Sequence, residues 1–333
     1  MPQHLFIPLA TWPSHAGQAA TPLDQALPHL AQLLGTWFAD APLAVAADWV
    51  TPIERCYADA LGWHASRATT RDPLPLAALQ DQATDAVPCA WVRPVHLISS
   101  MNDVRVCDPS VLRLSAAEAQ PLLQALAELC KEDGLQLDMR TPTRWLLRGE
   151  ALRHIRTPSL ALAANQHIAD YQPFLPDSVH TSTPTPESGE AKGNLQWLLR
   201  LQNEAQMLFY THPVNDARHA QRRPEVSGIW VEGAGAVATP AATAPTKQVI
   251  WCDALSAHAD DAHAWQAAWR ALDSDSLAPL LANPAGTADT VTFGNATHAI
   301  TWRRRAPTWW RRAKQPWQRL KLGRHPALPS SLL

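Results

Sequence analysis

Chemically capable side chains gather most densely near the end of a helix-forming run, within residues 194–235. There the chain reads His212-Pro213-Val214-Asn215 and continues to Arg218. An imidazole, an amide and a guanidinium all offer N–H donors, so together they suit a phosphate or a carboxylate. The spacing therefore indicates a small-anion site. A helix break with a capping Asn and a solvated basic loop explains the same residues, and the sequence leaves both interpretations open.

The elements around this motif can be predicted from the spacing of apolar residues. A buried helical stripe precedes it, formed by Trp197, Leu198, Leu201, Ala205 and Leu208. Arg200 and Glu204 lie four residues apart and are expected to pair on the helix surface. Pro213 ends the regular helix, because the residue before a proline is pushed toward extended geometry. A renewed helical turn would then place Asn215 and Arg218 on one side, ahead of a strand at 228–231 and a Gly turn at 233–235.

Strand and helix patterns alternate along the rest of the chain. Strands are predicted at 3–10, within 90–108, in a hairpin at 135–148, at 248–252 and in a hairpin at 290–305. Helices are predicted at 21–34, 51–61, 115–133 and 262–272, with capping boxes at Thr51/Glu54 and Ser115/Glu118. Residues 66–87 are predicted to be irregular, and 177–193 and 234–246 to be linkers. The alternation is typical of the α/β class, with a smaller α+β portion near 103–150.

Charge is unevenly distributed along the sequence. The 333 residues carry a net charge of −2, but from Trp302 onward there are nine Arg or Lys and no acidic residue. The remainder therefore holds 19 basic against 30 acidic residues. Residues 302–325 also interleave Trp with Arg. Such a tail suits single-stranded nucleic acid, an anionic membrane surface or the chain's own acidic body, and these interpretations stay open.

Several classes of protein and site are disfavoured. No apolar run is long enough to cross a membrane, and the N-terminus lacks a signal-peptide pattern. The five cysteines are scattered without metal or redox spacing, which predicts reduced, mostly buried thiols in a cytoplasmic protein. There is no P-loop, no G-x-S-x-G motif and no complete dinucleotide-binding glycine pattern.

A second group of polar residues reads His258-Ala259-Asp260-Asp261-Ala262-His263. Two His and two Asp in six residues could suggest a metal site. A helix, however, would separate the two imidazoles by about 140°. Asp260 and Asp261 are instead predicted to be acids in the first turn of a helix, where the helix dipole favours them.

The stretch LQNEAQMLFYTHPVNDARHAQRRPEVSGIWVEGAG resembles a segment of the archaeal-type, cofactor-independent phosphoglycerate mutases. It is closer still to the RpfE-type bacterial regulatory proteins. TPLDQALPHLAQL, CDPSVLRLSAAEAQPLLQALAE and EDGLQLDMRTPTRWLLR follow the mutase pattern in the same order, and Arg144 falls at a family arginine. The resemblance to the bacterial group covers nearly the whole chain. It implies an α/β fold with a reduced alkaline-phosphatase-like or mutase-like core and a small inserted α+β domain.

The sequence departs from the mutases at the residues that their chemistry needs. The superfamily holds two metals with Asp and His and uses a Ser or Thr nucleophile. Here the first strand, HLFIPLA, lacks the family's Asp-Gly pair, and no Asp-His dipeptide occurs. We therefore expect no metal, no cofactor and no catalytic residue. The expected function is a regulatory protein that binds a small phosphorylated or carboxylated metabolite through Arg144, Asn203, His212, Asn215 and Arg218.

The resemblance also predicts a domain division. Residues 1–100 would form the first part of the core, 101–176 the insertion, 177–193 a linker, 194–300 the rest of the core and 301–333 a basic tail. Two other functions stay open at this level. One is a metal-dependent phosphomutase or phosphatase with an unrecognised site, and the other is a nucleic-acid-binding regulator that acts through residues 302–325.

Overall fold

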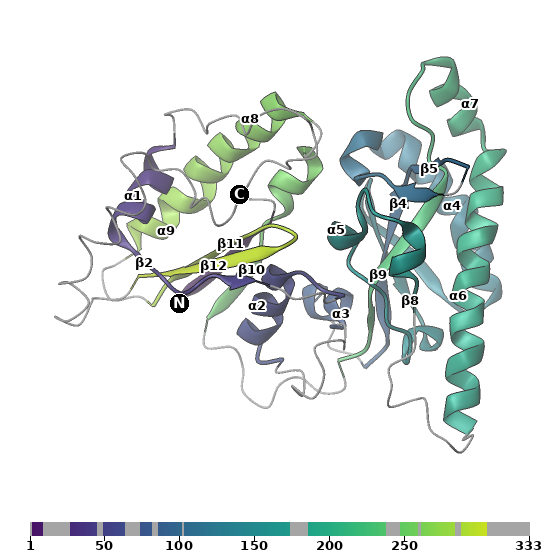
Figure 1. The fold of residues 1–333 in the computed structure, drawn as a ribbon, viewed down its shortest axis with the longest axis horizontal. Coiled ribbons are helices and arrows are strands. Elements are labelled where there is room, and N and C mark those ends of the chain that lie inside the picture. The colour runs from purple at the N-terminus through teal and green to yellow at the C-terminus, as the bar shows by residue number, and fades with distance from the viewer. Residues whose placement is uncertain are drawn as a thin grey trace. The chain divides into compact units, whose positions relative to one another are not determined.

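The computed structural model describes residues 2–8, 27–44, 49–63, 74–81, 86–101, 103–173, 186–237, 247–258, 261–283 and 288–304. The chain divides into two compact units (Figure 1). Unit 1 comprises residues 1–46, 51–62 and 244–333, and unit 2 comprises residues 47–50 and 63–243. Both units combine strands with helices, so the predicted α/β class is confirmed. Within the described ranges, no helix has the length and apolar character needed to cross a membrane.

Unit 1 is built on one mixed sheet. Its strands run in the order β10 (Gln248–Trp251), β1 (Gln3–Ile7), β11 (Thr290–Gly294), β12 (His298–Arg303) and β2 (Phe38–Ala39), and β3 (Leu43–Ala44) also pairs with β12. β1 is parallel to both β10 and β11, whereas β11 and β12 form an antiparallel hairpin. The sheet therefore joins segments from the two ends of the described chain.

The two faces of this sheet differ because successive side chains of a strand point in opposite directions. Leu5 and Ile7 join an apolar core with α1 (Pro28–Thr36), α8 (Ala262–Leu272) and α9 (Ala278–Ala282). His4 and Phe6 face the other side, where α2 (Pro52–Ala60) packs (Figure 1). A glycine at position 294 permits this packing, since a Cβ there would lie 2.7 Å from the Cβ of Ile53.

Unit 2 is built on an antiparallel sheet. Its strands run in the order β7 (Gln136–Thr141), β8 (Arg144–Arg148), β4 (Cys89–Val95) and β9 (Gly228–Gly235). One face packs against α4 (Ala116–Glu132) and α6 (Pro186–Tyr210), and α3 (Leu76–Gln80) packs on the other. β5 (Leu97–Ser99) pairs with β6 (Val104–Val106), and α5 (Leu160–Ala163) and α7 (Pro213–Ala220) complete the named elements of unit 2.

Most predicted elements are confirmed. β1, β10, α2, α4, α8 and the hairpins β7–β8 and β11–β12 lie where the patterns place them. α1 covers part of the helix predicted at 21–34, but it begins only at Pro28, after the non-helical Leu27, and ends at Thr36. Both capping boxes form, at Thr51/Glu54 and at Ser115/Glu118. Arg200 pairs with Glu204 on α6, with Nε 3.5 Å from Oε1. All five cysteines are free thiols, and Cys89, Cys107 and Cys130 are buried.

Three local predictions are wrong. Residues 66–87 are not irregular throughout, since α3 covers Leu76–Gln80. The predicted linker 177–193 extends too far, because α6 begins at Pro186, and a proline is tolerated in the first turn of a helix. Gly233 and Gly235 do not form a turn after the strand but lie within β9. Gly233 has φ +63°, and a Cβ there would come 2.9 Å from the backbone nitrogen of Ala77, so the strand tolerates only glycine at this point.

Unit 2 takes in the predicted insertion 101–176 together with residues on both sides of it. The predicted boundaries near residues 100 and 194 fall inside this unit, and the observed boundaries fall near residues 62 and 244. Parts of the two predicted linkers lie outside the described residues. These parts are residues 177–185 of the first linker and 238–246 of the second.

Asp273 begins the π-helical turn Asp273–Leu277 and caps α1 from far along the chain. Its carboxylate accepts hydrogen bonds from the backbone N–H groups of His29 (3.2 Å) and Leu30 (2.7 Å). In Asp273→Ala these two N–H groups lose their acceptor, so we expect the free energy of unfolding to fall by about 1–3 kcal/mol. Chemical denaturation measures the change, and Asp275→Ala, at an exposed position in the same turn, is the matched control. An equal effect in the two variants would contradict the capping role.

Candidate functional site

The predicted anion-binding motif forms the start of α7 in unit 2. His212 is the N-cap of α7 and Pro213 is its first residue, so the predicted renewal of the helix is confirmed. The Nδ1 atom of His212 accepts a hydrogen bond from the backbone N–H of Val214 (3.2 Å). Asn215 and Arg218 are 3% and 1% exposed. The helix therefore brings the three residues together, but it turns two of them into the protein.

Asn215 bonds to the backbone at two places, Phe209 and Val226. Its Nδ2 donates to the carbonyl oxygens of Phe209 and Val226, each at 2.8 Å, and its Oδ1 accepts from the N–H of Val226 at 2.9 Å. The side chain thus ties the end of α6 to the segment that enters β9. These bonds use the amide for structure, in agreement with the capping interpretation of the sequence.

Arg218 is held by carbonyl groups and by one carboxylate. Its guanidinium donates to the carbonyl oxygens of Pro224 (2.7 Å) and Leu112 (2.5 Å) and to Oε1 of Glu118 (2.8 Å). Arg223 donates to the same Glu118 oxygen at 2.8 Å. An anionic ligand at Arg218 would therefore have to displace Glu118.

The other two predicted ligands lie elsewhere in unit 2. Asn203 is exposed on α6. Arg144 lies on β8, on the face of the sheet that packs against α3, where its guanidinium stacks 4.0 Å from the centre of the Trp91 ring and donates to Gln80. α7 packs on the opposite side, with α4 and α6. The structure does not gather the five residues in one place, and their contact with a ligand stays a prediction.

The mutase resemblance would place an Asp-Gly pair of metal donors at the end of the first strand. At the carboxyl end of β1 the chain has Ile7 and Pro8, which offer no carboxylate. No group of three or more His, Cys, Asp or Glu in the described ranges is placed to hold a metal ion. Asp261 caps α8, accepting hydrogen bonds from the N–H groups of His263 (3.0 Å) and Ala264 (3.1 Å), which confirms its predicted place at the start of a helix. Asp260 lies outside the described residues.

Only the first residues of the basic tail are described. Trp302 is buried in β12, and Arg304 donates to the carbonyl of Leu281 at 2.9 Å and to Asp289 at 3.4 Å. The start of the tail is thus part of unit 1. The tail from residue 305 onward, with most of the proposed nucleic-acid segment, lies outside the described residues.

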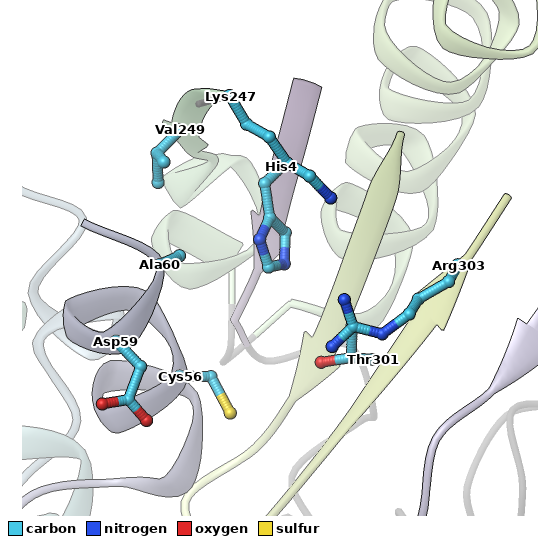
Figure 2. A pocket seen from close by; sticks show the side chains of 8 residues that line it. All are labelled: His4, Cys56, Asp59, Ala60, Lys247, Val249, Thr301 and Arg303. Atoms are coloured by element: carbon cyan, nitrogen blue, oxygen red, sulfur yellow. The ribbon is translucent and has the colours of Figure 1, made fainter. Parts of the chain in front are cut away.

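A cavity of about 350 Å³ lies in unit 1, on the α2 side of the sheet (Figure 2). Its walls come from β1, from β10 and the residue before it, from β12 and from α2. The lining residues are His4, Cys56, Asp59, Ala60, Lys247, Val249, Thr301 and Arg303. Because His4 is the second residue of β1 and Lys247 precedes β10, the cavity lies at the amino ends of these parallel strands.

His4 begins a polar chain across this face of the sheet. Its Nε2 lies 2.8 Å from Oγ1 of Thr292, and that hydroxyl lies 2.8 Å from Oγ1 of Thr301, its cross-strand partner. The histidine is 8% exposed. Burial, followed by the charges of Lys247 and Arg303, lowers the pKa of His4 to about 3. The imidazole is therefore neutral at physiological pH and takes part in hydrogen bonding without a charge.

Lys247 and Arg303 supply the positive charge of the cavity. Nζ of Lys247 donates to Oγ1 of Thr290 at 3.3 Å, and burial and the charge of Arg303 lower the lysine's pKa. Nε of Arg303 donates to Asp40 at 2.5 Å. Burial and the charge of Asp59 raise the pKa of the Cys56 thiol to about 11, so it is protonated at neutral pH. The cavity thus offers two cations, a neutral ring and a hydroxyl to a ligand.

Sequence reasoning missed this cavity because its residues are scattered along the chain. The pairing of Gln3 with Gln248 brings the first strand beside residues more than 240 positions away. One signal could have pointed to it. Thr290, Thr292 and Thr301 lie on one face of the predicted hairpin, and this polar face is unusual in a segment that is otherwise buried.

The chain shows only limited similarity to known proteins. No family model matches the sequence, and no curated protein matches it. Among solved structures, the chain is similar to a cofactor-independent phosphoglycerate mutase from Thermoplasma acidophilum DSM 1728, at 14% identity and a TM-score of 0.35, over 91% of this chain and 89% of the other. It is also similar to the PH0037 protein from Pyrococcus horikoshii, at 11% identity and a TM-score of 0.40, over 91% and 87% of the two chains. At these TM-scores the similarity assigns neither a fold family nor a function.

The ion pair between Glu118 and Arg218 is expected to make the stability of the folded protein depend on pH. Burial raises the pKa of Glu118, but hydrogen bonds from Ser115, Arg218 and Arg223 outweigh it and lower the value from 4.5 to about 2. Because the folded pKa is depressed, the stabilisation is complete above pH 4.5 and is lost as the pH falls toward 2. At pH 7 we expect Glu118→Gln to reduce the free energy of unfolding by about 1–3 kcal/mol.

Denaturant titrations of the wild type and of Glu118→Gln between pH 7 and pH 3 measure this effect. The difference between the two proteins should shrink below pH 4.5. Glu128→Gln, at an exposed position on the same helix α4, controls for a general loss of charge. A difference that is independent of pH would show that the pair does not carry the stabilisation.

Proposed function

We propose that this protein binds a small phosphorylated or carboxylated metabolite, and that the cavity of unit 1 is its binding site. The observation that carries the proposal is the convergence of Lys247 and Arg303 on a cavity whose buried histidine is neutral (Figure 2). An anion placed there would meet Nζ of Lys247 and the terminal N–H groups of Arg303, whose Nε is bonded to Asp40. Arg303 adds a planar fork suited to a carboxylate or phosphate, and Lys247 adds a compact charge.

The electrostatics of the empty cavity favour an anionic occupant. Burial and the charge of Arg303 lower the pKa of Lys247 and outweigh the opposing charge of Asp289, so the charged form of the lysine is disfavoured. A bound anion would restore the charged form. Because the lysine is partly buried, its attraction for an anion is screened less than that of a surface lysine.

The dimensions of the cavity favour a small ligand. A volume of about 350 Å³ is at the lower end of the range of roughly 300–1,000 Å³ typical of small-molecule sites. Val249 and Ala60 add apolar wall, and Thr301 adds a hydroxyl. A metabolite with one anionic group and a short carbon skeleton fits this lining better than a nucleotide does.

A regulatory role without catalysis is part of the proposal. Its support is the resemblance to the RpfE-type regulatory proteins together with the state of the cavity's groups. The thiol of Cys56 is protonated and the imidazole of His4 is held neutral by burial, so neither is activated at neutral pH. We also propose that unit 1 is a reduced alkaline-phosphatase-like core. The interruption of unit 1 by unit 2 in the sequence supports an insertion.

The binding proposal predicts a loss of affinity in Lys247→Met. Isothermal titration calorimetry at low ionic strength should detect binding of inorganic phosphate or 3-phosphoglycerate to the wild type. Replacing the lysine removes a charge-assisted hydrogen bond, so affinity should fall roughly tenfold to a hundredfold. Lys192→Met, at an exposed position on α6, is the matched control and should bind as the wild type does.

The same titrations distinguish the two candidate anion sites, the cavity of unit 1 and the start of α7. Binding that survives in Lys247→Met but disappears in His212→Ala would move the site to α7. No heat of binding in the wild type with either probe or with acetate would overturn the proposal of an anion site.

A further inference from the structure

The hydrogen bonds that begin at His4 connect two parts of the cavity wall. Nε2 of His4 lies 2.8 Å from Oγ1 of Thr292, and this oxygen lies 2.8 Å from Oγ1 of Thr301. His4 and Thr301 line the cavity, whereas Thr292 is fully buried behind them. Figure 2 shows His4 between helix α2 and the strand that carries Thr301. A ligand can therefore reach the two ends of this hydrogen-bonded chain but not its middle.

The donor hydrogens of the chain can be counted. A neutral imidazole carries one N–H, and each threonine hydroxyl has one hydrogen to donate. His4 is held neutral by its burial and by the nearby charges of Lys247 and Arg303. The ring and the two hydroxyls therefore have three donor hydrogens, and the two bonds between them use two. One hydrogen is left for a ligand.

The direction of the bonds decides which end keeps that hydrogen. If Nε2 donates, Thr292 donates to Thr301, so the Thr301 hydroxyl can donate into the cavity and Nδ1 of His4 accepts. If Nε2 accepts, Thr292 accepts from Thr301, so Nδ1–H donates and the Thr301 oxygen accepts. Bonds from both sides to Thr292 would strand its buried hydroxyl hydrogen, since Thr292 has no other partner within the described ranges. In either allowed direction, one end donates and the other accepts.

The accepting end matters because the two cations of the cavity can only donate. Neither the ammonium of Lys247 nor the guanidinium of Arg303 has an acceptor. An anion without hydrogen, such as sulfate, would bring a lone pair to the accepting end of the chain. An anion that also carries an O–H group can donate there and accept from the other groups. Sites with such a partner reject ligands that lack the hydrogen, because the buried acceptor is then left unpaired.

We infer that this cavity selects small anions that carry an O–H group, hydrogen phosphate or a hydroxy acid, over anions that carry none. The inference rests on the proposed function and narrows its ligand class. Thr292 is the residue that couples the two ends, although it does not itself line the cavity. It is therefore a positioning residue, which acts on the ligand through His4 and Thr301.

Two pairs of probes test the inference. Hydrogen phosphate is compared with sulfate, which has the same tetrahedral shape and no hydrogen at this pH, and glycolate is compared with acetate. Calorimetry on the full chain at low ionic strength and pH 7.5 gives the four affinities. The O–H member of a pair should bind roughly tenfold more tightly, as one buried hydrogen bond allows. A preference in the first pair identifies a phosphate, and a preference in the second identifies a hydroxy acid.

Substitution of Thr292 separates the coupling from simple contact. In Thr292→Val both ends become free to donate, so the preference should disappear, chiefly because sulfate or acetate binds more tightly than to the wild type. A general loss of structure would weaken all four probes instead. Thr292→Ser keeps the hydroxyl and should keep the preference. Thr297→Val, exposed in the turn of the same hairpin, should bind every probe as the wild type does.

A second variant keeps the test decisive if Thr292→Val does not fold. Thr301→Val removes one end of the chain at a partly exposed position. Thr292 would then donate to Nε2, and Nδ1–H would be the donor that remains. The accepting end is lost, so the preference for an O–H group should disappear in this variant too.

Failure of this inference differs from failure of the proposed function. If none of the four probes binds the wild type, the anion site itself is refuted. Equal affinities within both pairs would leave the anion site standing and refute the selection. A preference that persists in Thr292→Val would also refute the inference, and its loss in Asp59→Asn would then assign the O–H group to the carboxylate on α2.

Discussion

The parallel pairing of β1 with both β10 and β11 is the constraint on which unit 1 depends. Gln3 is paired with Gln248, and His4 is paired with Val249 on one side and with Thr290 on the other. Parallel strands need long connections, and here those connections hold several helices and all of unit 2. The same pairing fixes the faces of β1, so Leu5 and Ile7 enter the apolar core while His4 faces α2. The cavity is a direct result of that alternation.

Burial affects the polar groups near α7 and those near the cavity of unit 1 in different ways. In unit 2, Asn215 and Arg218 are buried with their hydrogen bonds committed to carbonyl groups and to Glu118. Their burial is tolerated because those bonds compensate for the loss of water. In unit 1, Lys247 has a depressed pKa beside a second cation. Hydrogen bonds thus compensate for the burial of Asn215 and Arg218, whereas at Lys247 burial and the charge of Arg303 outweigh the opposing charge of Asp289.

Local features of the sequence predicted most of the elements. The capping boxes at Thr51 and Ser115, the proline at 213 and the alternation in the two hairpins each act over a few residues, and each is found in the structure. α3 was missed because its five residues, Leu76–Gln80, give too short a period to recognise. Gly233 was taken for a turn residue, but it is needed because α3 packs directly against its backbone. Such a contact between distant segments leaves no local pattern in the sequence. The cavity was missed for the same kind of reason, since strand order cannot be deduced from the spacing of residues within strands.

The discontinuity of unit 1 has a consequence for the order in which the chain can fold during synthesis. Residues 63–243 of unit 2 emerge from the ribosome as one continuous stretch, whereas β1 must wait for β10 and β11 to be made. Domains generally fold as units once their residues are available. Unit 2 can therefore complete its antiparallel sheet first, while the apolar residues of β1 are still without partners. β1 is thus synthesised well before the two strands that it pairs with, and during that interval its unpaired edges are open to wrong pairing.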